Sequence, residues 1–135
     1  MIKPDAVGNA YTGKIIDHIL TSGFEILGMK VTKMTKAVAE AFYEVHAERP
    51  FYGELTEFMS SGPTVVLALK KDNAVPEWRK TIGATDPKEA DTGTIRKLYA
   101  ENKGRNAVHG SDSDENAEKE IAFFFTNQEI ILNKG

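Results

Sequence analysis

The chain has 135 residues, enough for one domain, with 41% hydrophobic and 27% charged residues and a formal net charge of −3 at pH 7. This balance argues against a primary nucleic-acid or membrane partner, and the lack of cysteine excludes disulfides, thiolate metal ligands and thiol nucleophiles. With no apolar run of about 20 residues and no signal peptide, we expect a cytoplasmic protein that forms a single domain over residues 1–135.

Hydrophobic spacing predicts helices and strands in alternation. Ile15, Ile16 and Ile19 share one helical face, whereas the β-branched run after the turn at Gly62 is typical of a strand. After a short strand at the N-terminus, the predicted elements are a helix at 13–24, a strand at 24–34, helices at 36–47 and 53–62, a strand at 64–71, helices at 75–83 and 110–125, and a final strand at 129–133.

This order of elements predicts an α/β protein, a β-α-β-β-α-β sandwich with an antiparallel sheet and helices over one face. In the helix at 36–47, we expect Thr35 to be the N-cap and Phe42 and Val45 to face the core. Residues 84–108 form a polar stretch that is too long for a simple connection, and such loops usually carry function.

The stretch GNAYTGKI, residues 8–15, resembles a phosphate-binding P-loop but lacks two of its parts. A P-loop needs a hydroxyl residue after its lysine to hold Mg²⁺, and Ile15 stands at that position. The segment before it is also a poor match for the buried strand that leads into such a loop. We therefore interpret residues 8–15 as a turn into the first long helix.

The stretch GRNAVHGSDS is the densest candidate for chemistry. His109 lies just ahead of the last predicted helix, and Asp112 with Glu115 matches a capping box. The amides of residues 110–112 would then attract an anion, Gly110 would leave room for a ligand, and His109 could act on a phosphate as nucleophile or base. The alternative is a solvated loop histidine beside an ordinary helix cap.

Three arginines in or beside loops, Arg79, Arg96 and Arg105, are a second indication of phosphate binding. The guanidinium fork matches phosphate geometry, although loop arginines are often merely solvated. Phe51 follows a proline ahead of a predicted helix, where it would either pack in the core or stack on a base.

Four stretches resemble, in order and spacing, the nucleoside diphosphate kinase family: IKPDAV…TGKII, RPFYGELTEFMSSGPTVV, IGATDPKEADTGTIR and RNAVHGSDSDENAEKEIAFFF. The similarity runs over nearly the whole chain, and the family motif N-x-x-H-G-S-D-S stands at residues 106–113. The resemblance implies a ferredoxin-like fold and a homo-oligomer. It also implies ping-pong transfer of the γ-phosphate from a nucleoside triphosphate to a nucleoside diphosphate through a phosphohistidine, with Mg²⁺ carried on the nucleotide phosphates.

The resemblance further implies a role for each matching residue of the reaction centre. His109 would be the nucleophile, and Glu120 the carboxylate that hydrogen-bonds its other ring nitrogen and supports the developing cation. Ser111 matches a hydroxyl near that carboxylate, and Tyr43 would lie beside the histidine.

The resemblance also divides the expected substrate contacts among the parts of the nucleotide. Lys3 and Asn106 match residues that contact the ribose, and Phe51 matches an aromatic that stacks on the base, which suits an enzyme indifferent to base identity. The matching substrate-binding residues, including the phosphate clamp of two arginines and a threonine, are Lys3, Phe51, Leu55, Arg79, Thr85, Arg96 and Asn106.

Two positions depart from the family pattern. The chain starts almost on the IKPD motif, where the family has several more strand residues, and Lys103 stands where an aliphatic residue usually packs against the base. Two rival functions are a family member that carries phosphate to proteins and a ferredoxin-like nucleic-acid or scaffold module that has lost catalysis. The intact set of histidine, lysine, arginines and glutamate argues against the scaffold.

Overall fold

The structure is a computed structural model that describes residues 1–133. In this part of the chain, helices outnumber strands. None of the helices in this part of the chain has the length and apolar character needed to cross a membrane. In chain order the elements are α1 (Pro4–Gly8), α2 (Thr12–Thr21), β1 (Glu25–Thr32), α3 (Lys36–Phe42), the 3₁₀ helix η1 (Glu44–His46), α4 (Tyr52–Met59), β2 (Thr64–Lys70), α5 (Ala74–Ile82), α6 (Ile95–Tyr99), α7 (Asp114–Phe124) and α8 (Asn127–Asn133).

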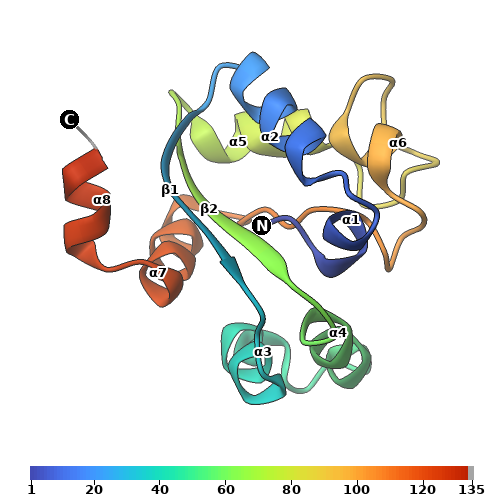
Figure 1. The fold of residues 1–135 in the computed structure, drawn as a ribbon. Helices are drawn as coiled ribbons and strands as arrows, with labels where there is room; N and C mark the ends of the chain where they lie inside the picture. The colour runs from blue at the N-terminus through green and yellow to red at the C-terminus, as the bar shows by residue number, and fades with distance from the viewer. Residues whose placement is uncertain (134–135) are drawn as a thin grey trace.

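The sheet is built around the antiparallel pair β1–β2, with a register irregularity between Ile26 and Gly28. Beside β2, Ile2 forms isolated antiparallel bridges to Val65 and Val108, so the predicted N-terminal strand is reduced to a bridge and is followed at once by α1. The order across the sheet is therefore β1, β2, Ile2, Val108. This order confirms the predicted βαββαβ topology, but the last strand position is occupied by Val108 and not by residues 129–133. The hairpin of α3 and α4 is inserted between β1 and β2 and lies at one end of the molecule (Figure 1). The register pairs Glu25 with Lys70, Met29 with Leu67 and Thr32 with Thr64.

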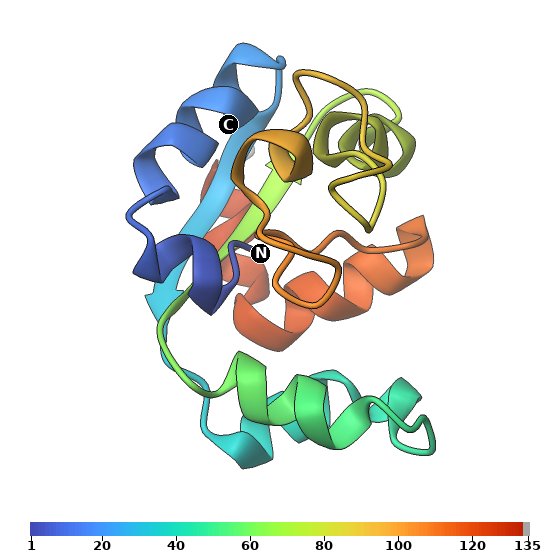
Figure 2. The ribbon, with the colours of Figure 1, turned by 90° about the vertical axis from the view of Figure 1, so that its right-hand side faces the viewer.

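Helices lie on both sides of this sheet, and not over one face only as predicted (Figures 1 and 2). The two helices that connect strands, α2 and α5, lie on the same face, as the sandwich topology requires, and they enclose a core with Ile15, Ile19, Phe24, Trp78 and Ile82. On the opposite face α7 and α8 cover a second cluster, in which the buried members are Leu27, Val66, Ala68 and Phe125. The alternation of Val65 and Val66 between the two clusters follows from the two-residue period of a strand.

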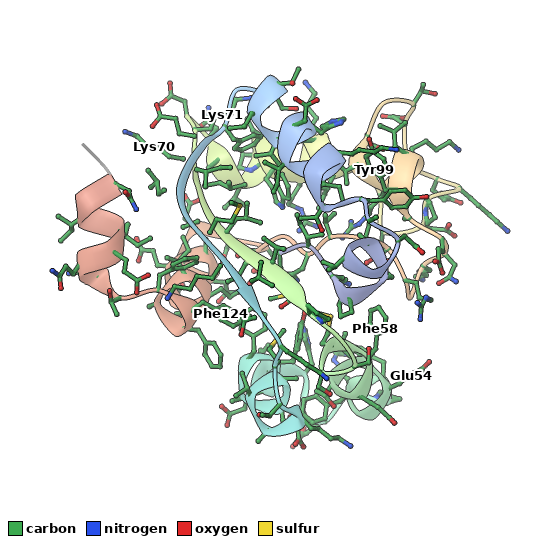
Figure 3. All side chains as sticks on the ribbon, viewed as in Figure 1. Glu54, Phe58, Lys70, Lys71, Tyr99 and Phe124 are labelled. Atoms are coloured by element: carbon green, nitrogen blue, oxygen red, sulfur yellow. The ribbon has the colours of Figure 1, made fainter. Side chains whose placement is uncertain are left out.

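The α3–α4 hairpin shows one correct and one wrong prediction. Thr35 caps α3, because its Oγ1 accepts from the Val38 N–H at 3.1 Å. The helix ends at Phe42 and the chain tightens into η1, so Val45 is 84% exposed and does not face the core. Phe124 of α7 packs at 5.1 Å between ring centroids against Phe42 and joins the hairpin to the rest of the fold (Figure 3).

The start of α7 also differs from the prediction. Ser113 is the N-cap and its Oγ accepts from the Asn116 N–H at 3.1 Å, so the predicted capping box of Asp112 and Glu115 is wrong. The Asp112 carboxylate instead accepts from Asn116 Nδ2 at 2.6 Å. Consequently the amides of residues 110–112 precede the cap and do not form the first turn of the helix.

The predicted C-terminal strand at 129–133 is wrong, because residues 127–133 form helix α8. A reciprocal pair of hydrogen bonds starts this helix: the Thr126 N–H donates to Glu129 Oε1 at 3.1 Å, and the Glu129 N–H donates to Thr126 Oγ1 at 3.2 Å. These two bonds are a capping box, which overrides the strand-like appearance of the apolar run that follows.

The packing of α7 on the sheet can be tested at Gly28. A Cβ there would lie 2.8 Å from Phe125 Cε1, whereas a Cβ at Gly53 in α4 would meet nothing within 4 Å. We expect Gly28→Ala to lower the free energy of unfolding by about 1–3 kcal/mol through overpacking. The control Gly53→Ala should raise it by about 0.5–1 kcal/mol, because alanine favours the helix. Urea unfolding measures both, and equal effects would contradict the close contact at Gly28.

Candidate active site

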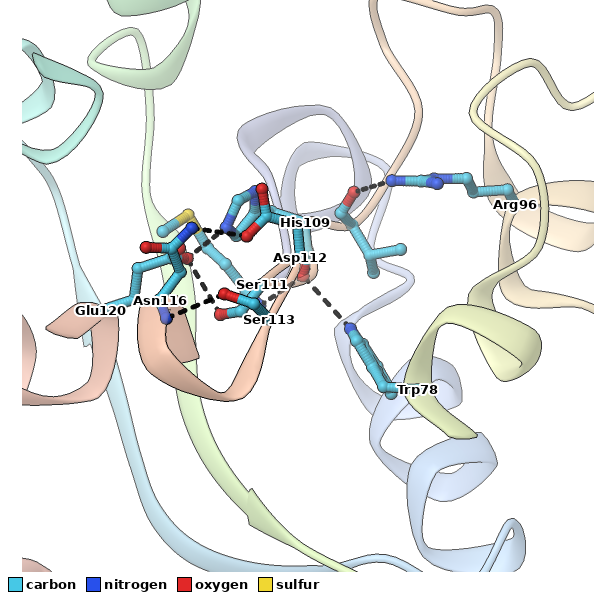
Figure 4. A network of polar contacts seen from close by, with 10 residues as sticks. Trp78, Arg96, His109, Ser111, Asp112, Ser113, Asn116 and Glu120 are labelled. Atoms are coloured by element: carbon cyan, nitrogen blue, oxygen red, sulfur yellow. Dashed lines mark hydrogen bonds and ion pairs between the residues drawn. The ribbon is translucent and has the colours of Figure 1, made fainter. Parts of the chain in front are cut away.

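Hydrogen bonds connect three polar side chains just after Val108, the residue that bridges to Ile2: His109, Ser111 and Glu120 (Figure 4). His109 Nε2 lies 2.5 Å from Glu120 Oε1, and Ser111 Oγ donates to the same carboxylate oxygen at 3.1 Å. Glu120 reaches this point from the second turn of α7, nine and eleven residues after its two partners. The capped helix therefore holds the carboxylate, and the preceding loop presents the imidazole to it.

The contact with Glu120 determines which ring nitrogen of His109 is free. A carboxylate only accepts hydrogen bonds, so Nε2 carries the proton and Nδ1 keeps its lone pair. Burial lowers the pKa of His109 below its ordinary value, and the hydrogen bond to Glu120 opposes this effect. The neutral imidazole with a free Nδ1 is the form that can act as a nucleophile or base.

Two aromatic side chains flank the imidazole. The rings of Phe42 and Tyr43 stand nearly edge-on to His109, with centroids at 5.7 Å and 6.0 Å. The Tyr43 hydroxyl is buried and has no hydrogen-bond partner within residues 1–133. Burial, followed by the nearby charge of Glu120, raises the pKa of Tyr43, so the hydroxyl stays protonated and can donate a hydrogen bond.

Trp78 lies under the loop that follows His109, and sequence reasoning did not select it. Its Nε1–H donates to the His109 carbonyl at 3.4 Å (Figure 4). A Cβ at Gly110 would lie only 2.6 Å from Trp78 Cδ1, so the glycine is needed for the approach of this indole. The space that we expected Gly110 to leave for a ligand is therefore filled by tryptophan.

Lys3 and Asn106 meet beside the loop that leads to His109. Lys3 Nζ donates to Asn106 Oδ1 at 2.7 Å, and Asn106 Nδ2 donates to the Thr85 carbonyl at 3.4 Å. Burial, followed by the positive charge of Arg96, lowers the pKa of Lys3 to about 8. This ammonium is therefore a cation that an incoming anion would stabilise.

Arg79, Thr85 and Arg96 line one cavity of about 350 Å³ between α5 and α6. Arg96 donates through Nη1 to the Gly83 carbonyl at 3.1 Å. It also donates through Nη2 to the Val108 carbonyl at 3.0 Å, the contact drawn for Arg96 in Figure 4. Burial and the neighbouring Arg79 lower the pKa of Arg96 to about 10. The cavity thus joins two guanidinium groups with a hydroxyl, a set suited to phosphate oxygens.

The remaining predicted residues do not join the contacts around His109. Phe51 caps α4 and is 48% exposed, with its ring 5.5 Å from that of His46, and Leu55 follows one helical turn later. Arg105 pairs with Glu101 at 2.9 Å and lies 5.2 Å over the ring of Phe58, so this loop arginine is engaged outside the cavity.

Comparison with known proteins gives one family for almost the entire chain. The family described as "Nucleoside diphosphate kinase" matches residues 1–130. A nucleoside diphosphate kinase of Flavobacterium psychrophilum is 59% identical over 129 residues, which cover 96% of this chain and 93% of that protein. A nucleoside diphosphate kinase of Chlorobaculum parvum is 58% identical over 131 residues, which cover 97% of this chain and 94% of that protein.

Solved structures give the same result for the fold. The crystal structure of the Aquifex aeolicus nucleoside diphosphate kinase superposes with a TM-score of 0.93 at 45% identity, covering 96% of this chain and 94% of that one. A nucleoside diphosphate kinase of Halobacterium salinarum in complex with CDP gives a TM-score of 0.89 at 35% identity, covering 95% of this chain and 86% of that one. The ferredoxin-like fold is thereby confirmed.

The electrostatics of the imidazole can be tested by titration. We expect Glu120→Gln to lower the pKa of His109 further, because the carboxylate stabilises the imidazolium and the amide does not. Measuring the imidazole resonances by NMR between acid and neutral pH gives the pKa in both proteins. An unchanged or raised value in Glu120→Gln would contradict the assigned contact.

Proposed function

The chain belongs to the nucleoside diphosphate kinase family, and on that premise we propose that it transfers the γ-phosphate of a nucleoside triphosphate to a nucleoside diphosphate through His109. The observation that carries this proposal is the imidazole whose Nε2 is bonded to Glu120, which leaves Nδ1 free to attack. The family match covers residues 1–130, which supports a single working domain.

The proposed reaction has two halves. In the first, Nδ1 of His109 attacks the γ-phosphorus in line, the N–P bond forms, and the bond to the β-phosphate oxygen breaks, releasing the nucleoside diphosphate. The ring becomes cationic while Nε2 keeps its proton, and the Glu120 carboxylate stabilises that charge. In the second half, a terminal phosphate oxygen of another nucleoside diphosphate attacks the phosphorus, and the N–P bond breaks.

The cations supply the positioning that phosphoryl transfer needs. In our proposal, Arg79, Thr85 and Arg96 hold the phosphates in their shared cavity, and Tyr43 donates its unpaired hydroxyl toward the transferred group. Lys3, bonded to Asn106, adds a cation on the same side of the loop. Of these groups, Lys3 and Arg96 are already held by hydrogen bonds, so their positions need little reorganisation when the nucleotide binds.

Mg²⁺ fits this arrangement as a companion of the nucleotide. Within residues 1–133, no three histidine or acidic side chains gather into a metal-binding group, so phosphate oxygens and water would be its direct ligands. Glu89 and Asp91 line the same cavity as the arginines and could accept hydrogen bonds from those waters. When bound, the ion neutralises part of the phosphate charge.

The base would lie against α4. Phe51 offers an exposed ring and Leu55 an apolar side chain on the same helical face, which suits stacking without selection of one base. The CDP bound by the Halobacterium salinarum relative supports a nucleoside diphosphate as one of the two substrates.

We also propose that the enzyme is a homo-oligomer. In residues 1–133, β1 has a single strand partner, and Asn133 of α8 covers part of its other edge by donating to the Leu27 carbonyl at 2.6 Å. Further along, β1 carries Met29 at 49% and Val31 at 73% exposure. Exposed apolar side chains on an edge strand are a natural surface for association with a second copy. A mass measurement in native buffer gives the number of subunits.

The phosphohistidine is the most direct test of the proposed function. Incubation with γ-labelled ATP should give an adduct that is labile in acid and stable in base, which is expected of a phosphoramidate at His109 and not of a phosphoester. His109→Ala should remove both the adduct and phosphate transfer while leaving nucleotide binding nearly unchanged. His18→Ala, on α2, serves as the control and should keep full activity. An acid-stable adduct, or turnover by His109→Ala, would refute the assignment.

The phosphate clamp can be tested with two exposed arginines. Arg79→Ala should reduce kcat/KM by the equivalent of about 1.5–3 kcal/mol, the contribution of a hydrogen bond to a charged group. Arg105→Ala removes the same charge outside the cavity and should have little effect. Steady-state kinetics with ATP and a nucleoside diphosphate measure both, and equal losses would exclude a specific role for Arg79.

A further inference from the structure

A strained turn lies just ahead of His109. Ala107 is fully buried and has a φ of +71°, and the Val108 N–H donates to the Asn106 carbonyl at 2.8 Å. A hydrogen bond across three residues with a positive central φ is the mark of the rare, strained γ-turn. A residue with a Cβ keeps this conformation only when the surrounding contacts enforce it.

Two hydrogen bonds from the N-terminal segment hold Ala107 in this conformation. Its N–H donates to Asp5 Oδ2 at 3.0 Å, and its carbonyl accepts from the Lys3 N–H at 2.8 Å. Asp5 is 3% exposed, and its other oxygen has no partner in residues 1–133, so the bond to Ala107 is the principal contact of a buried carboxylate. A hydrogen bond in such a dry environment is stronger than the same bond in water.

The turn determines where two groups of the proposed site lie. Its last residue, Val108, accepts from Arg96 Nη2 at 3.0 Å through its carbonyl, and His109 follows directly. Glu120, by contrast, is held by α7. A change of φ at Ala107 would therefore move His109 relative to a carboxylate that stays in place.

We propose that Asp5 is a positioning residue of the phosphotransfer reaction. It acts through Ala107. By its hydrogen bond to the γ-turn, the Asp5 carboxylate keeps His109 at a fixed position relative to Glu120 and Arg96. This inference rests on the function proposed above. In it Asp5 is neither the nucleophile nor a substrate contact, and it acts only by positioning the backbone that leads to His109.

The first test compares two substitutions of Asp5. Asp5→Ala removes the acceptor, so phosphorylation of His109 by ATP should slow by about tenfold or more while KM for ATP changes far less, because misplacement affects the reacting atoms. Asp5→Asn keeps an acceptor of the same shape and should retain most of the rate. If Asp5→Asn loses as much as Asp5→Ala, the charge of Asp5, which also raises the pKa of Lys3, is responsible, and the proposal is wrong.

The second test is rescue at Ala107. Glycine adopts a positive φ without strain, so Asp5→Ala combined with Ala107→Gly should recover a large part of the lost rate. Ala107→Gly alone should leave Tm unchanged or raise it, whereas the matched change Ala39→Gly, at a buried helical position, should lower Tm. A folded double variant no faster than Asp5→Ala would overturn the proposal. A loss of Tm in Ala107→Gly as large as that in Ala39→Gly would also overturn the proposal. This comparison does not require the Asp5→Ala protein to fold.

Loss of stability alone is controlled by Thr64→Val. This change removes another buried hydrogen bond, from Thr64 Oγ1 to the Thr32 carbonyl at 3.1 Å, and should lower Tm without slowing phosphorylation. NMR of the His109 imidazole gives a readout independent of activity, since Asp5→Ala should shift its resonances and Thr64→Val should not. If the wild-type chain takes no phosphate, the proposed function fails, yet the imidazole shifts still decide whether Asp5 positions His109.

Discussion

The pairing of Ile2 with Val65 is the contact on which the arrangement of the site depends. The Ile2 N–H donates to the Val65 carbonyl at 2.7 Å, the Val65 N–H donates back at 3.0 Å, and Ile2 bridges to Val108 on its other side. This one residue inserts the N-terminal segment between β2 and the segment that ends in His109. Lys3 follows directly, and it makes hydrogen bonds to residues 106 and 107. The same short segment therefore contributes both to the core and to the candidate site.

The second constraint is electrostatic. Lys3 and Arg96 are both buried. Burial and the charge of Arg96 lower the pKa of Lys3, whereas burial and the charge of Arg79 lower the pKa of Arg96. In a chain with a net charge of −3, this concentration of cations is local and not a general property of the surface. Backbone carbonyls of Gly83 and Val108 accept the hydrogen bonds of Arg96. The fold thus tolerates an unfavourable charge arrangement that a polyphosphate would relieve.

Sequence patterns predicted the features of this fold that depend on neighbouring residues. They did not predict contacts between residues that are far apart in the sequence. Periodicity at Ile15 and Ile19 and the cap at Thr35 depend on neighbours within a few residues, and both were predictable. The motif around His109 also consists of neighbouring residues, so it supported a chemical hypothesis from the sequence alone. The helix at 127–133 was missed because its apolar residues resemble a strand unless Thr126 and Glu129 are recognised as a capping box. The contact of Ala107 with Asp5 spans 102 positions, and nothing in the sequence near either residue indicates it.

Trp78 is the only tryptophan of the chain, and its indole N–H is bonded to the carbonyl of His109 while the ring closes the space over Gly110. Indole emission responds to the polarity and the charges around the ring. We therefore expect a chemical change at His109 to alter the emission of a chromophore already present in the chain, so that the reaction is open to optical measurement without an attached dye.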